Sequence, residues 1–333
     1  GKTKALTHRY AYLVNELGIS TSNILCVTFT NKAAREMSKR IRQMIGDSDT
    51  GYICTFHGFC VKLLREDIHA INFPQNFVVM DDEDTEEILK TVYENAHIQS
   101  RTYTFDSARD HITAMKSQML HIPYLAEIGN EKLLADYEKA EKVEDKVFLG
   151  YLYEQKKVYG LDYDDLITIA LYILQTDETK QIKWQERMMY VMVDEFQDVS
   201  NSQYALAEIL SGYHRNLFIV GDPDQTIYTW RGAQIEYILE FDETHENTRT
   251  IFLDMNYRST PEILTVSNSL IEKNKKRLPH RLEAYKESGR RPIYIHSKTT
   301  GDEAQWMTSE IQRLVSEGAS YNEMAVLYRS HFV

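Results

Sequence analysis

Between residues 191 and 198 the chain reads Val191-Met192-Val193-Asp194-Glu195-Phe196-Gln197-Asp198, a short apolar run that leads directly into two adjacent carboxylates. Such a run is typical of a buried strand in a parallel sheet. The carboxylates then stand at the carboxyl end of the strand, where open α/β sheets bind their ligands. Asp194 is placed to hold the ligand shell of Mg²⁺, and Glu195 to orient or deprotonate a water that attacks a phosphoryl group. The alternative is a strand-to-helix turn whose acids only cap the helix.

Other runs of the same kind extend the expected sheet. We expect buried parallel strands at residues 24–29, 188–193, 217–220, 250–253, 293–295 and 324–327. Helical spacing separates most of these runs, and strands that alternate with helices indicate an α/β doubly wound fold. The side chains at the carboxyl ends of the strands are therefore the candidates for ligand binding.

Two stretches depart from this alternation. Residues 82–175 show mainly helical spacing, which predicts an all-helical insertion into the first α/β domain. The acidic opening, residues 81–87, resembles a metal site in composition, but carboxylates also favour the positive end of a helix, and we interpret it as a helix start. Farther on, residues 259–262 place Pro261 at the first position of a helix, which predicts that a second α/β unit follows.

Length and composition set the class of protein. The 333 residues suit two domains, and 43% hydrophobic with 26% charged residues excludes disordered and collagen-like chains. No run of 18 apolar residues occurs, so we expect no membrane span. The three cysteines lack paired metal-ligand spacing and are typical of reduced thiols, which predicts a cytoplasmic location. The chain opens without methionine and stops in mid-pattern, so we expect a fragment of a longer protein.

The charge distribution restricts any nucleic-acid site to a local one. The net charge is −12, which argues against a protein that coats nucleic acid through overall positive charge. Residues 32–42 and 273–291 are nevertheless two basic patches. Charge alone leaves open whether each patch contacts a phosphate backbone or is a solvated helix face.

The first three residues, Gly1-Lys2-Thr3, match the end of the phosphate-binding motif G-x-x-x-x-G-K-[ST]. In that motif the lysine reaches the β- and γ-phosphates, and the hydroxyl ligates Mg²⁺. The tripeptide alone is common by chance. Its combination with Asp194 and Glu195 favours a nucleotide site over a helix cap.

The run at 217–220 also ends in polar residues. Gln225 follows it, and a glutamine can hydrogen-bond a γ-phosphate without adding charge, as a sensor of intact nucleotide would. Tyr228, Trp230 and Arg231 then place two aromatic rings and a cation in one loop. Aromatic faces stack on nucleic-acid bases, and core packing is the alternative for these rings.

Tyr257 and Arg258 follow the run at 250–253, at the expected junction between the domains. An arginine there is suited to stabilise charge on a γ-phosphate in the transition state, and a tyrosine to stack on adenine. A simple ion pair of Arg258 with a nearby carboxylate is the alternative.

Taken together and in order, these segments resemble the superfamily 1A DNA helicases of the UvrD, Rep and PcrA type. The matching segments are Gly1-Lys2-Thr3, residues 28–34, 55–57, 161–166, 194–198, 221–232, 256–260 and 326–329. Two departures are Ser330 and His331, which stand where many relatives have a threonine and a DNA-contacting asparagine.

The resemblance implies roles for individual residues. It implies that ATP and Mg²⁺ are bound or hydrolysed by Gly1, Lys2, Thr3, Asp194, Glu195, Gln225, Tyr257 and Arg258, with Thr3 and Asp194 on the metal. It implies that single-stranded DNA is bound by Phe29, Thr30, Asn31, Thr55, His57, Tyr228, Trp230, Arg231 and Arg329.

The resemblance also implies an organisation into motor domains of the RecA-like, P-loop type. Domain 1A takes residues 1–81 and 176–256, the helical insertion 1B takes 82–175, and 257–333 begin a second RecA-like domain, 2A. The implied activity is ATP-dependent translocation on single-stranded DNA, 3′ to 5′, with unwinding of single/double-strand junctions in repair or replication. Motifs beyond residue 333 are needed for a competent motor.

Three other functions are alternatives to this one. A helicase subunit of a RecB- or AddA-like helicase-nuclease fits the same residues. A nucleotide-gated DNA-binding protein has no need of a water-positioning acid such as Glu195. A P-loop kinase for small molecules has no use for the aromatic loop around Tyr228.

Overall fold

The computed structural model describes residues 1–46, 49–229 and 232–328. The chain divides into two compact units. The first consists of residues 1–253 and 274–280, and the second of residues 254–273 and the chain from 281 onward. Among the described residues, no helix is both long and apolar enough to cross a bilayer.

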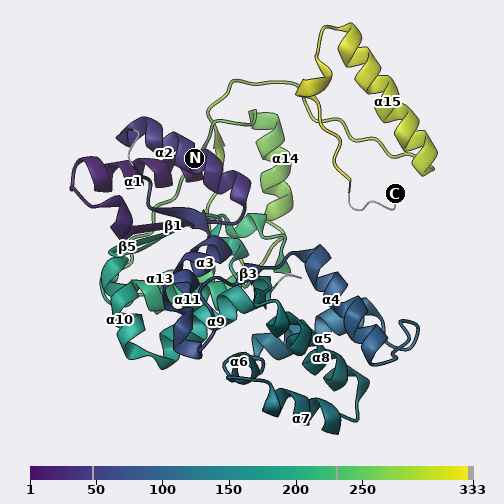
Figure 1. Ribbon diagram of the computed structural model, residues 1–333. Helices are drawn as coiled ribbons and strands as arrows, with labels where there is room; N and C mark the ends of the chain where they lie inside the picture. Colours follow the sequence, from purple (N-terminus) through teal and green to yellow (C-terminus); the bar gives the residue numbers. More distant parts are fainter. Residues whose placement is uncertain (47–48, 230–231, 329–333) are drawn as a thin grey trace. The chain divides into compact units, whose positions relative to one another are not determined.

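A four-stranded parallel sheet in the order β2-β1-β5-β6 forms the centre of the first unit (Figure 1). Its strands are β1 (Ile24–Thr28), β2 (Tyr52–Thr55), β5 (Tyr190–Val193) and β6 (Leu217–Ile219). In the register, Cys26 lies opposite Ile53 on one side and Met192 on the other. The prediction of an α/β fold with a parallel sheet is confirmed, as are the strands expected near 24–29, 188–193 and 217–220.

Helices cover both faces of the sheet, as the all-apolar strands require. Ile24 and Cys26 of β1 pack in one cluster with residues of α1 (Lys2–Asn15) and α2 (Asn31–Ile45). Leu25 and Val27, which alternate with them, belong to the cluster of the opposite face. That face is covered by α3 (Phe56–Asp67), α9 (Tyr163–Thr176) and α11 (Asn201–Ser211). The carboxyl ends of all four strands are thereby left at one edge of a rigid sandwich.

Between β2 and β5 the chain forms a group of helices with a hydrophobic core of its own. The helices that supply this core are α4 (Asp82–Asn95), α5 (Phe105–Ser117), α7 (Glu131–Lys139) and α8 (Val143–Lys157) (Figure 1). The buried residues of α6 (Ile122–Leu125) belong instead to the cluster that packs against the sheet. Asp81 caps α4 in a capping box with Asp84, which confirms that the acidic opening is a helix start. The region predicted to lack strands contains a two-residue one, β4 (Gly160–Leu161), which pairs with β3 (Val78–Val79).

A buried polar network joins these helices to α9. Lys116 of α5 is fully buried, and its Nζ lies 2.5 Å from Asp162 Oδ2 and 2.8 Å from Asp165 Oδ1. Asp162 and Asp165 form the capping box of α9. Tyr151 of α8 donates a hydrogen bond of 2.7 Å to Asp162 Oδ2. Burial disfavours the Lys116 cation, but the two carboxylates outweigh it and raise the lysine pKa, so the network holds an ionised lysine.

A second polar contact is buried beneath α10 (Glu178–Arg187). Asp67 Oδ2 accepts hydrogen bonds of 2.7 Å from both Trp184 Nε1 and Lys183 Nζ. Burial works to raise the pKa of Asp67, but these hydrogen bonds outweigh it and hold the pKa below its ordinary value. The ionised form of Asp67 is therefore the one that stabilises the fold.

Replacing Asp67 by Asn is expected to lower the free energy of unfolding at pH 7 by about 1.5–3 kcal/mol, because the acceptor of two hydrogen bonds becomes a neutral amide. In the unchanged protein the Asp67 contribution is complete above the unfolded-state pKa, about 4, and is lost as the pH falls through the lower folded-state pKa. Urea unfolding followed by tryptophan fluorescence should therefore show a smaller loss of stability below pH 4 in Asp67→Asn. An equal acid loss in both proteins contradicts the assignment. Asp110→Asn, at an exposed position, is the control.

Helices and short strands complete the two units. The first unit also contains α12 (Glu236–Leu239) and α13 (Phe241–Thr244). The second contains β7 (Met255–Asn256), α14 (Pro261–Ile271), β8 (Glu283–Ala284) and α15 (Thr300–Ser316), with β7 and β8 paired in parallel. Pro261 occupies the first turn of α14, which confirms the predicted helix start.

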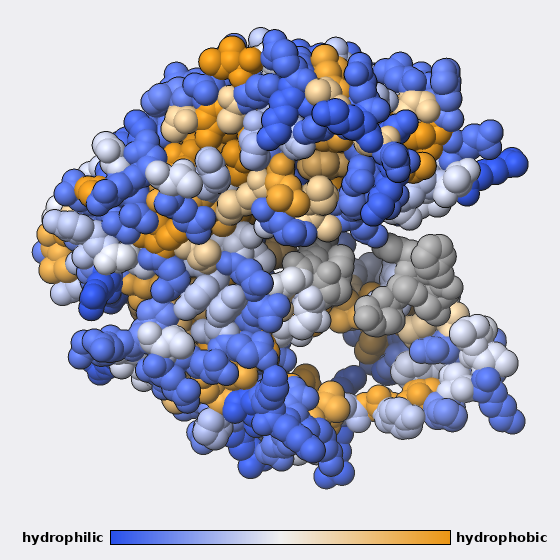
Figure 2. Space-filling model, turned by 90° about the horizontal axis from the view of Figure 1, so that it is seen from below, coloured by the Kyte–Doolittle hydropathy of each residue, from blue (hydrophilic) through white to orange (hydrophobic). Residues whose placement is uncertain are grey.

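The strands predicted at 250–253, 293–295 and 324–327 are wrong, because these segments are irregular. Their apolar side chains are exposed, for example 66% at Ile251 and 94% at Leu327. A strand forms only where a neighbour supplies hydrogen bonds, and no described segment pairs with these three. Figure 2 shows one face of the protein, which is mainly hydrophilic with apolar residues in separate groups.

Candidate nucleotide and nucleic-acid site

The amino end of α1 lies at the centre of the candidate site. Gly1 is its N-cap residue, and the first turn has neither a side-chain cap nor an acidic residue. The first N–H groups of a helix lack partners within the helix, and they carry the positive end of its dipole. Helices α2, α3, α9 and α11 differ, because a side chain caps each of them. The start of α1 thus presents donors to an anion.

Two residues of this first turn meet the carboxylates that follow β5. Lys2 Nζ lies 2.7 Å from Glu195 Oε2. Thr3 Oγ1 donates a hydrogen bond of 3.3 Å to Asp194 Oδ2. The fold therefore brings together Lys2, Thr3, Asp194 and Glu195, four residues from the two motifs that the sequence analysis combined.

The backbone turns sharply at Glu195, whose φ of 52° lies in the left-handed region. Consecutive side chains of a strand point to opposite faces, so a regular extension of β5 would separate the two carboxylates. The left-handed turn lets both reach the start of α1. This conformation is uncommon for a residue with a side chain, and such strain is concentrated at functional sites.

The two carboxylates differ in their affinity for protons. Burial, together with the charge of Glu195, raises the pKa of Asp194. Burial also works to raise the pKa of Glu195, but the hydrogen bonds from Lys2 and Gln197 outweigh it and lower that pKa. Glu195 is thus held as a carboxylate beside Lys2. The raised pKa of Asp194 means that a cation bound next to it would favour its ionised form.

The residues fit a magnesium ion that is shared with a phosphate. The Thr3 hydroxyl and the Asp194 carboxylate supply hard oxygen ligands from adjacent positions. Mg²⁺ is usually bound through one or two protein ligands together with substrate phosphates and waters. Consistent with this, the described residues contain no cluster of three or more acidic, histidine or cysteine side chains that would hold a metal alone.

Gln197 was not predicted as a site residue, yet it connects two parts of the site. Its Nε2 donates to Glu195 Oε2 at 3.0 Å, and its Oε1 accepts from the Asp222 backbone N–H at 2.9 Å. The side chain is buried. A Cβ at Gly221 would lie 2.8 Å from Gln197 Oε1 and 2.5 Å from Ile238 Cδ1, so a larger residue at 221 would have to displace these two side chains. The only signal in the sequence was its place two residues after Glu195.

Gln225 joins the site indirectly. Its Nε2 donates a hydrogen bond of 2.5 Å to Asp222 Oδ2, so a chain of hydrogen bonds runs from Glu195 through Gln197 and Asp222 to Gln225. Within the described part of the chain, Gln225 forms no hydrogen bond with Lys2, Thr3 or the two carboxylates.

The residues predicted to bind DNA gather at the carboxyl ends of neighbouring strands. Phe29, just after β1, stacks on Tyr228 with ring centroids 4.9 Å apart and planes at 23°. Thr30 caps α2 and Thr55 caps α3, so both hydroxyls already accept backbone N–H groups. Asn31 is exposed at the start of α2.

His57 lies in the first turn of α3, where its ring meets Tyr163 edge to face at 5.5 Å. Burial lowers the pKa of His57, so the ring is neutral at neutral pH. A neutral imidazole donates one hydrogen bond and accepts another, and it adds no charge to this edge of the sheet.

The remaining predicted residues belong to the second unit or lie outside the described part of the chain. Tyr257 and Arg258 belong to the second unit, where Tyr257 contacts Tyr285 at 4.8 Å and the Arg258 backbone N–H donates to Asn256 Oδ1 at 2.9 Å. Trp230, Arg231 and Arg329 lie outside the described residues.

Comparison with known proteins identifies the family of the chain. Residues 1–246 match the UvrD/REP helicase N-terminal domain, and residues 251–332 match the UvrD-like helicase C-terminal domain. The chain is 37% identical over 332 residues to the ATP-dependent DNA helicase PcrA of Staphylococcus aureus, and 36% identical to that of Staphylococcus epidermidis. Each match covers 99% of this chain but only 44% and 45% of the relative. The chain spans less than half the length of these relatives, and it belongs to the UvrD/REP helicase family.

Proposed function

We propose that this chain supplies the nucleotide-binding part of an ATP-dependent DNA helicase, which couples Mg-ATP hydrolysis to 3′-to-5′ movement along single-stranded DNA and to unwinding in repair or replication. The observation that carries the proposal is the meeting of Lys2 and Thr3, at the uncapped start of α1, with Asp194 and Glu195. An anion site beside a pair of carboxylates suits a phosphate that is bound together with a cation.

In this proposal each residue has one task. Lys2 and the N–H groups of the first turn of α1 bind the phosphates, and Thr3 and Asp194 hold Mg²⁺. The metal, when bound, neutralises charge on the phosphate oxygens. Glu195, ionised beside Lys2, orients the attacking water and accepts its proton. Tyr257 and Arg258, for adenine and the γ-phosphate, rest on the family resemblance.

The hydrogen bonds around Gln197 support a link between nucleotide and DNA. One end of this side chain binds Glu195, and the other binds the turn at Asp222, which leads into the loop that carries Tyr228. Tyr228 stacks on Phe29, the first of the proposed DNA contacts. A movement of the Glu195 side chain could thus be passed through Gln197 and the backbone after Asp222 to the ring pair of Tyr228 and Phe29.

The test is ATP hydrolysis by the intact gene product with and without single-stranded DNA. We expect strong stimulation by DNA. Phe29→Ala should weaken the binding of single strands by about 1–3 kcal/mol and reduce the stimulation, because one stacking face is lost. Nucleotide binding should stay unchanged in this variant.

Two results would count against the proposal. A protein that binds DNA but shows no stimulated hydrolysis is a nucleotide-gated binder and no motor. A Phe29→Ala variant with normal DNA binding and a lower melting temperature shows that the aromatic pair is only core packing.

A further inference from the structure

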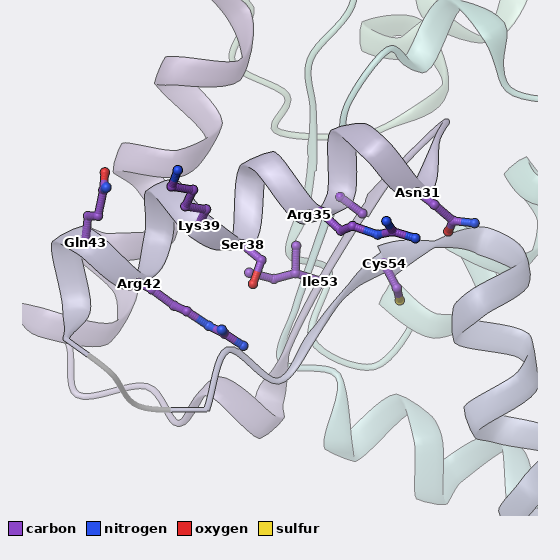
Figure 3. A pocket seen from close by; sticks show the side chains of 9 residues that line it. Asn31, Arg35, Ser38, Lys39, Arg42, Gln43, Ile53 and Cys54 are labelled. Carbon is purple, nitrogen blue, oxygen red and sulfur yellow. The ribbon is translucent and has the colours of Figure 1, made fainter.

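A hollow along the outer edge of the sheet is lined by one face of α2. Its volume is about 750 Å³, and its lining residues are Asn31, Ala34, Arg35, Ser38, Lys39, Arg42 and Gln43 of α2 with Ile53 and Cys54 of β2 (Figure 3). The α2 residues recur at intervals of three and four, which places them on a single helix face. We call this hollow the α2 groove.

The α2 groove is positively charged. Arg35, Lys39 and Arg42 line it, and none of its nine lining residues is acidic. The neighbouring cation Arg40 instead forms an ion pair with Glu36, and neither of these two lines the groove. By contrast, Arg35, Lys39 and Arg42 form no ion pair with any residue that the structure describes.

Helix stability does not account for this arrangement. Like charges three and four residues apart repel each other on a helix, so this row of cations destabilises α2 unless an anion lies beside it. A favourable interaction with the helix dipole applies only to Arg42, which lies in the last turn. The exposed side chains of Arg35 and Lys39 are therefore available to an external anion.

The position of the groove identifies the kind of partner. Asn31 lies at one end of the groove and directly follows Phe29 and Thr30, the proposed DNA contacts after β1. Strand β2 forms one edge of the sheet in this unit, and its Ile53 and Cys54 form the other wall of the groove. A nucleic-acid strand that passes Phe29 and Asn31 therefore meets the three cations next.

We propose that the α2 groove binds the phosphate backbone of single-stranded nucleic acid where the strand continues beyond Asn31. The inference rests on the proposed function and extends the DNA path to residues that no motif singles out. From Arg35 to Arg42 the helix rises roughly 10 Å, enough for the row to contact more than one phosphate. A groove of cations that follows the backbone, next to an aromatic stacking site, is the usual arrangement for binding without sequence preference.

The test compares oligothymidylates of about 6 and about 20 nucleotides, the shorter one filling only the stacking site. Their affinities for the intact gene product are measured by fluorescence anisotropy at salt concentrations from about 50 to 200 mM. In the triple variant Arg35→Ala/Lys39→Ala/Arg42→Ala, the long strand should bind about tenfold more weakly, and the slope of log affinity against log salt should fall by about 0.7 per lost phosphate contact. Binding of the short strand should change little.

Arg40→Ala is the matched control, because it removes one positive charge from the same helix outside the groove. Its salt slope and length dependence should equal those of the unchanged protein. Thermal unfolding checks that the triple variant is folded.

Three results overturn the inference alone: an unchanged long-strand affinity and slope, an equal loss for both lengths, or a loss confined to duplex DNA. If the protein without substitutions binds neither oligothymidylate, both the proposed function and this inference are overturned.

Discussion

Replacing Glu195 by Gln is expected to leave ATP binding intact and to lower the rate of hydrolysis by about 10²- to 10⁴-fold. The amide has nearly the same shape but cannot accept a proton from the attacking water. The substitution also removes the negative charge that lies 2.7 Å from Lys2 Nζ. Lys2 therefore remains available to bind a phosphate. Steady-state hydrolysis with single-stranded DNA measures the loss, and a fluorescent ATP analogue measures binding.

Glu208→Gln provides the control for this experiment. It makes the same substitution in the same unit, at a residue whose side chain pairs with His245 and not with a member of the site. Its hydrolysis should match that of the unchanged protein. Normal turnover in Glu195→Gln would refute the role of Glu195. Loss of nucleotide binding together with a lower melting temperature would make Glu195 a structural residue.

Replacing Lys116 by Met is expected to lower the free energy of unfolding of the first unit by about 3–5 kcal/mol. The fully buried ammonium lies 2.5 Å from Asp162 and 2.8 Å from Asp165. Its removal leaves Asp162 and Asp165 without their cation in a largely buried site. Chemical denaturation followed by circular dichroism measures the loss.

The cost should come from the unpaired charge and not from the change in shape. Adding Asp162→Asn to Lys116→Met should therefore recover part of the stability. Burial works to raise the pKa of Asp162, but Lys116 outweighs it and keeps this carboxyl ionised, whereas burial raises the pKa of Asp165 to about 7. Lys139→Met, at an exposed position of α7, should change stability by less than about 0.5 kcal/mol. A loss below about 1 kcal/mol for Lys116→Met, or no recovery in the double variant, contradicts this account.

The sequence predicted three of the four strands of the main sheet because β1, β5 and β6 are short apolar runs between helices. It missed β2, a four-residue strand at one edge of the sheet. The apolar runs at 250–253, 293–295 and 324–327 look the same in sequence but have no partner strand in the structure. The local sequence pattern indicates a preference for extended backbone, whereas the pairing of strands depends on residues that are distant in the sequence.

The candidate site was predictable where a motif carried it. Lys2, Thr3, Asp194 and Glu195 belong to two motifs whose known geometry requires them to meet, and they do. The roles of Gln197 and Lys116 were not predictable. The hydrogen bonds of Gln197 depend on where the Asp222 turn lies. In the sequence, Lys116 cannot be distinguished from an ordinary exposed lysine on an amphipathic helix. Such contacts arise from packing between elements, which spacing along one element does not encode.

The distance along the chain between the two halves of the nucleotide site has a consequence for folding. Lys2 and Glu195 are 193 residues apart, and β1 pairs with β5 across the whole helical insertion. Closing so long a loop is entropically costly, but the insertion has a core of its own, so folding it first shortens the effective loop. The anion site then exists only in chains whose sheet has closed. A nucleotide that binds only these chains would shift the folding equilibrium toward them by mass action. Its binding would thus stabilise the last step of assembly, in which the sheet closes.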